Sequence, residues 1–164
     1  EDDKLQAEFE ALDYLFTRHP LSFYEDVAAR HGCVPAAELR RCVGRLVKAL
    51  GWKIAEKRTV ARRTGESMKF LSLEDDGATF EVTLFPDVYR RVAPLTRGYG
   101  PFLVVGRVEE EFGAVSITAR NLDNLGFLDH WLCGAFAPRD SFFNIPEGEW
   151  CEAGEDCSVQ LKQG

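Results

Sequence analysis

The sequence predicts a mainly β protein in which a small five-stranded barrel follows a helical N-terminal extension. Short runs of alternating apolar and polar residues recur between positions 47 and 120, as half-buried strands require. Turn-forming residues separate the runs, and such spacing is typical of small barrels and sandwiches. At 164 residues the chain is long enough to bury the core of one ordinary domain.

The order of the predicted elements narrows the choice of barrel. Gly51 lies inside the long first strand and is expected to mark a bulge or a sharp coil. Residues 86–93 are predicted to form a two-turn helix that Pro94 ends. Three strands, a short helix and two further strands are the order of the Greek-key barrel called the OB-fold. The predicted strands are 47–57, 68–73, 79–85, 102–109 and 114–120.

Helical patterns precede the barrel. Apolar residues recur at three- and four-residue steps over 5–18, and Ser22 with Glu25 has the spacing of a capping box ahead of a helix over 23–30. We therefore expect three regions. These are a helical extension or linker at 1–41, an OB-fold nucleic-acid-binding domain at 42–125, and a partly helical or disordered tail at 126–164.

The composition argues against several classes of protein. No apolar run approaches the length of a membrane span, and no signal peptide precedes the fold, so we expect a cytoplasmic chain without a membrane partner. The five cysteines have no zinc-like spacing, and we expect free thiols, with Cys151 and Cys157 as the one pair that could argue otherwise. Because no phosphate loop, metal motif or catalytic triad is visible, we predict no catalytic residue, metal or cofactor.

Charge is distributed very unevenly. Ten of the twenty basic residues lie at 40–69, against two acids, so this window is +8 in a chain whose net charge is −7. Such a one-sided distribution indicates phosphate binding, whereas the alternative is a solvated hairpin that offsets an acidic body. In OB-folds the loop between the first two strands and the face of strands two and three bind oligonucleotides. The basic candidates are Lys53, Lys57, Arg58, Arg62, Arg63 and Lys69.

Aromatic side chains near these charges are candidate stacking platforms for bases. They are Trp52, Phe70 and Phe85, and the alternative for each of the three is packing in the core. Residues 109–111 are three consecutive glutamates in the loop between strands four and five, and they would repel phosphate. Binding should therefore depend on the first loop.

Four segments carry a resemblance to a known family. They read LDYLFTRHPL at 12–21, GESMKFLSLED at 65–75, FEVTLFPDVY at 80–89 and PFLVVGRV at 101–108. Together they resemble the C-terminal OB-fold region, with the stretch before it, of the bacterial DNA polymerase III alpha subunit. Arg18 stands where that family usually has glycine, and the family's metal-binding polymerase palm has no counterpart in this chain.

The resemblance implies an origin in a DNA-directed DNA polymerase without polymerase chemistry in this piece. It implies single-stranded DNA as the partner, together with other replisome subunits. Two alternatives stay open. One is a protein-interaction module that has lost DNA binding, favoured by the net charge and the acidic second loop, and the other is a tRNA-binding OB domain.

Overall fold

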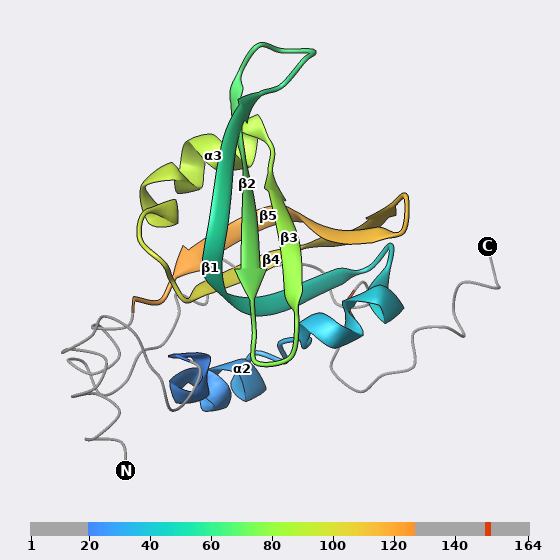
Figure 1. Cartoon of the computed structure of the whole chain (residues 1–164), viewed down its shortest axis with the longest axis vertical. Coiled ribbons are helices and arrows are strands. Elements are labelled where there is room, and N and C mark those ends of the chain that lie inside the picture. Colours follow the sequence, from blue (N-terminus) through green and yellow to red (C-terminus); the bar gives the residue numbers. More distant parts are fainter. Residues whose placement is uncertain (1–19, 127–149, 152–164) are drawn as a thin grey trace.

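The computed structural model describes residues 20–126 and 150–151 (Figure 1). Its strands are β1 (Leu46–Val60), β2 (Ser67–Glu74), β3 (Thr79–Leu84), β4 (Phe102–Glu111) and β5 (Ala114–Asn124). Its helices are η1 (Pro20–Tyr24), α2 (Glu25–Arg30), η2 (Ala36–Cys42), α3 (Pro86–Val92) and η3 (Ala93–Thr96).

The strands close into a barrel in the order β1-β2-β3-β5-β4, with β4 returning to β1. All pairs are antiparallel except β3 with β5, and α3 lies between β3 and β4 in the sequence. This confirms the predicted five-stranded OB-fold. Four strands extend beyond their predicted ends, with β1 reaching Val60 and β5 reaching Asn124, whereas β3 ends at Leu84, one residue before its predicted end.

β1 pairs with a different neighbouring strand along each half of its length. Residues Leu46 to Gly51 pair with β4, and Trp52 to Val60 pair with β2. A Cβ atom at Gly51 would lie 2.7 Å from the Leu73 Cβ and 2.8 Å from the Phe80 ring. The backbone of β1 therefore approaches these two side chains more closely than any residue other than glycine would allow. The register shift itself comes three residues later, at Ile54.

Two apolar clusters hold the fold together. The main cluster fills the barrel, with Leu71, Val82 and Ile117 completely buried. The second joins η1 and α2 to the outside of the barrel, where Tyr24 packs near Leu103 and its hydroxyl donates a hydrogen bond to the Gly126 carbonyl, 3.1 Å away. In Figure 1 this helical layer lies at the end of the barrel opposite the β1–β2 loop. Among the described residues no helix is both long and apolar enough to cross a membrane.

The start of α2 corrects one prediction. Ser22 lies inside η1, and the residue before α2 is Tyr24, which makes no capping bond from its side chain. The capping box is wrong because a 3₁₀ turn runs directly into the helix and leaves no extended residue at Ser22. The helix predicted at 5–18 lies outside the described residues.

The cysteines give a second correction. Cys42, at the end of η2, forms a disulfide with Cys151, with the two Cα atoms 6.0 Å apart. Cys151 reaches this position because its N–H donates to the Leu46 carbonyl of β1. The expectation of free thiols is therefore wrong for this pair, whose separation of 109 residues leaves no local spacing to recognise. Cys33 is free, whereas Cys133 and Cys157 lie outside the described residues.

Candidate nucleic-acid interface

Strand register decides which candidate residues share a face of the barrel. Lys57 pairs with Phe70 across β1 and β2, and Phe70 pairs with Thr83 on β3. Paired residues point to the same side of a sheet, and the neighbours of Phe70 along β2 are buried in the opposite direction. Phe70 is thus half-buried on the outside of β1, β2 and β3. We call this side the outer face, and its residues, of which Met68 and Thr83 are themselves buried, are Ala55, Lys57, Thr59, Met68, Phe70, Ser72, Glu81 and Thr83.

The basic loop projects from one end of the outer face (Figure 1). Arg62 and Arg63 are exposed in this loop, which Gly65 closes by donating its N–H to the Ala61 carbonyl over 2.8 Å. Gly65 has a φ of +72°, a left-handed conformation that glycine adopts more readily than other residue types do. The loop therefore presents two cations at the end of the β1–β2 hairpin, beyond the pair of Lys57 and Phe70 along the strands.

A groove of about 450 Å³ lies between this loop and the start of α3. Arg62 and Arg63 line one part of the groove, and Met68 and Phe85 give it an apolar part. Phe85 is 46% exposed, which is unusual for a phenylalanine and leaves its ring available to a ligand. The groove thus combines two cations and an aromatic ring with two carboxylates, because Glu66 and Asp87 also line it.

Two of the predicted cations point elsewhere. Lys53 and Lys69 both contact the Oε2 atom of Glu56, with their Nζ atoms at 2.7 Å and 2.9 Å. Their side chains are only 11% and 9% exposed. Lys69 also donates to the Thr96 hydroxyl at 3.1 Å, and Lys53 donates to the Thr96 carbonyl at 3.2 Å. This buried lysine pair connects the sheet to η3.

Glu56 responds to these two lysines. Hydrogen bonds from Lys53 and then from Lys69 hold the pKa of the Glu56 carboxyl below its ordinary value, although partial burial opposes them. The carboxylate therefore stays ionised and offsets one of the two positive charges. Lys53 and Lys69 are held inside the protein, away from where a phosphate on the outer face would lie.

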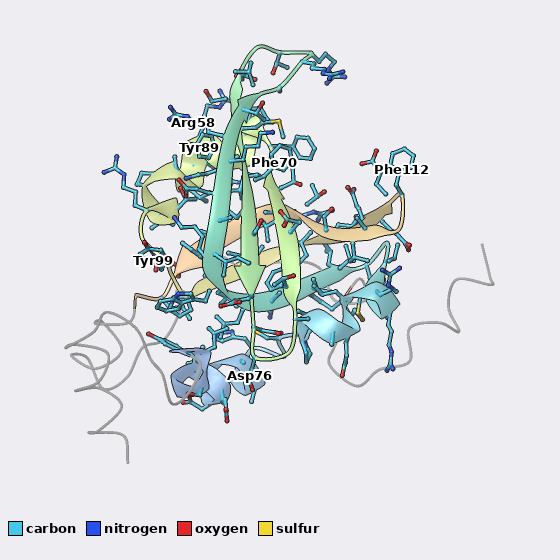
Figure 2. The ribbon with its side chains drawn as sticks, viewed as in Figure 1. Arg58, Phe70, Asp76, Tyr89, Tyr99 and Phe112 are labelled. Carbon is cyan, nitrogen blue, oxygen red and sulfur yellow. A yellow bond between two sulfur atoms is a disulfide. The ribbon has the colours of Figure 1, made fainter. Side chains whose placement is uncertain are left out.

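The remaining candidates also divide between faces. Arg58 pairs in register with Lys69, and Figure 2 shows Arg58 on the same side as Tyr89 of α3, with Phe70 on the other side of the strands. Trp52 is half-buried against the second apolar cluster and pairs with Glu74, far along β1 from the basic loop. The predicted residues thus fall into separate groups: Lys57 and Phe70 share the outer face, Arg62, Arg63 and Phe85 line the groove, and Trp52, Lys53, Arg58 and Lys69 lie elsewhere.

The β4–β5 hairpin holds a residue that the sequence analysis did not single out. Phe112 occupies its tip and is fully exposed. The predicted acidic run next to it is partly neutralised, because Glu110 forms an ion pair with Arg40 at 3.1 Å. Glu109 accepts a hydrogen bond from the Thr118 hydroxyl at 2.8 Å and keeps its full charge. The sequence does contain a signal that could have identified Phe112, because it is an aromatic residue directly before the glycine of a hairpin turn.

Within the described part of the chain, no group of three or more His, Cys, Asp or Glu side chains could hold a metal ion. On the outer face the structure places one cation, Lys57, beside an aromatic ring, Phe70.

Comparison with known proteins gives relatives of one kind. No protein-family profile matches the sequence. The chain is 36% identical over 123 residues to an error-prone DNA polymerase of Symbiobacterium thermophilum, an alignment covering 73% of this chain and 11% of that protein. It is 31% identical over 107 residues to DNA polymerase III subunit alpha of Bacillus subtilis, covering 65% and 10%. The chain thus spans about a tenth of the length of these curated relatives.

Proposed function

Since the chain is a homologue of a segment of the bacterial DNA polymerase III alpha subunit and of error-prone DNA polymerases, we propose that it is their single-stranded DNA-binding module. The observation that carries this proposal is the position of Phe70, half-buried on the outer face between Lys57 and Thr83 and below the loop of Arg62 and Arg63. Bases stack on such rings whatever their sequence, while the cations contact the backbone phosphates.

The proposal gives each grouped residue a role. Phe70 and Phe85 are platforms for bases, and Lys57, Arg62 and Arg63 contact phosphates. Lys53 and Lys69 support the sheet from behind and touch no DNA. The chain itself performs no polymerisation in this proposal, which makes it an auxiliary module of a DNA-directed DNA polymerase in the cytoplasm, acting beside other replisome subunits.

The proposal retains the expected division of the chain. Residues 42–125 are the binding domain, 1–41 the N-terminal extension and 126–164 the tail.

The test is fluorescence anisotropy with a labelled oligothymidine across a salt series. Each phosphate contact on a single strand contributes about −0.7 to the slope of log affinity against log salt, so three exposed cations predict a slope near −2. The Arg62→Ala/Arg63→Ala variant should flatten that slope by about 1.4. The matched control is Arg41→Ala/Arg97→Ala, which removes the same charge at exposed arginines in η2 and after η3.

Equal slopes for the two double variants would show that net charge alone attracts DNA and would count against the site. No binding by the wild type at low salt would favour the second candidate, a protein-interaction module. The observation on that side is the −7 net charge together with the three consecutive glutamates of the β4–β5 hairpin.

A further inference from the structure

The turn between β4 and β5 contains an unusual residue. β4 ends at Glu111 and β5 begins at Ala114, so Phe112 and Gly113 are the two residues of the turn, with φ of 51° and 81°. A two-residue hairpin with both φ values positive favours Asn or Asp before the glycine. A bulky side chain at positive φ is strained, and this one is also fully exposed to water. Neither feature stabilises the fold, and together they point to a function.

Arg40 braces this turn. Its guanidinium donates to the Gly113 carbonyl over 3.0 Å and to the Glu110 carboxylate over 3.1 Å. The backbone of the turn is therefore held by a cation whose side chain is 63% exposed. An exposed ring on a turn that a cation braces can stack a base while the cation attracts the adjoining phosphate.

The hairpin continues the outer face. β5 pairs with β3 in parallel, so Thr118 stands beside Thr83, which itself stands beside Phe70. Figure 2 shows Phe70 and Phe112 both on the side of the strands away from α3. The path between the two rings crosses Thr83, which is buried, and Thr118, which is half-buried, and the carboxylates of Glu81 and Glu109 lie on the same side.

We propose that Phe112 is a second stacking platform for a base of single-stranded DNA, one that a strand reaches only when it is long enough to cross the outer face from the β1–β2 loop. This inference rests on the proposed function. It also assigns the acidic hairpin a role, since Glu109 and Glu110 hold Thr118 and Arg40 in place as well as repelling phosphate.

The experiment compares the wild type with Phe112→Asn, a substitution that suits the turn, on oligothymidines of increasing length. Short strands that reach only Phe70 and the basic loop should bind both proteins equally. Strands beyond a threshold, within the range of about 4–16 nucleotides that OB-folds cover, should bind the variant roughly 5- to 100-fold more weakly, as the loss of one stacked base requires. Phe112→Tyr keeps the ring and should restore the affinity.

A thermal unfolding scan accompanies the binding series, because removing strain should leave the melting temperature of Phe112→Asn equal to or above that of the wild type. Equal affinity of wild type and variant at every length would overturn the role of Phe112 while leaving the proposed function standing. An equal loss at every length, with a lower melting temperature, would overturn it too, as damage to the hairpin. Failure of the wild type to bind any strand would overturn both proposals.

Discussion

The two halves of β1 share a strand and differ in nearly everything else. Leu46 to Gly51 are mostly buried, pair with β4, and lie next to Cys151, whose disulfide fixes the end of η2. Trp52 to Val60 pair with β2 and become exposed, with Ile54 at 50% and Val60 at 56%. The first half anchors the barrel, and the second half extends the basic hairpin away from it (Figure 1).

Under the proposed function, this difference assigns stability to one half of the strand and binding to the other. Gly51 lets the strand coil between two partners, and the second half is then free to project because the first is fully held. Substitutions in the anchoring half, or in the buried lysine pair, should therefore alter unfolding. Substitutions on the outer face should alter binding.

The largest effect is expected at the disulfide. Because the bond closes a loop of 109 residues, Cys42→Ala/Cys151→Ala should lower the free energy of unfolding by up to about 4–5 kcal/mol under oxidising conditions. Urea unfolding followed by circular dichroism measures this, and dithiothreitol should remove the difference between wild type and variant. DNA affinity should not change, since the bond lies beside the anchoring half of β1.

Cys33→Ala is the control for the disulfide. Burial raises the pKa of the Cys33 thiol to about 12, so this residue stays a protonated thiol both with and without reductant. A wild type whose stability is the same with and without reductant would contradict the prediction and restore the expectation of free thiols.

A smaller effect is expected at Glu56. Glu56→Gln removes the charge that Lys53 and Lys69 share, and it should lower the free energy of unfolding at pH 7 by about 1–2 kcal/mol, a range reduced because the carboxylate is 42% exposed. Since the folded protein lowers the pKa of this carboxyl, its contribution is complete above the unfolded value and declines as the pH falls through the folded one. The difference between wild type and variant should thus be constant at neutral pH and shrink below about pH 4.5.

Denaturant unfolding at several pH values measures that difference. Glu81→Gln is the matched control, because Glu81 lies on the exposed side of β3 and accepts a hydrogen bond from Ser72 at 2.6 Å. If Glu56→Gln and Glu81→Gln changed the free energy of unfolding equally at every pH, the buried lysine pair would need no charged partner.

The same residues show how far the sequence could predict this structure. Alternation and turn residues were sufficient for the five strands, their order and the inserted helix, because a barrel buries one side of every strand. The sequence could not predict which side of the sheet each lysine side chain occupies. Lys53 and Lys57 are four apart and would share a face in a regular strand, but the shift at Ile54 places Lys53 opposite buried Leu73 and Lys57 opposite Phe70.

Contacts between distant parts of the chain were also beyond local patterns. The Cys42–Cys151 bond depends on residue 151 lying beside Leu46, and no spacing rule connects positions 109 apart. Phe112 could have been found, since a phenylalanine before a hairpin glycine departs from the usual turn residues. The prediction of the acidic loop considered charge alone.

The smallest effect separates two lysines of the same hairpin. Lys57→Met should leave the melting temperature unchanged and flatten the salt slope for single-stranded DNA by about 0.7, because one exposed phosphate contact is lost. Lys69→Met keeps the aliphatic stem but removes the contacts to Glu56 and Thr96, so it should lower the free energy of unfolding by roughly 1 kcal/mol and leave the slope as it is. Anisotropy and thermal unfolding on the same two samples measure both quantities. If Lys69→Met flattened the slope as much as Lys57→Met, the buried lysine pair would be accessible to phosphate, and the division between a supporting side and a binding side of the hairpin would be wrong.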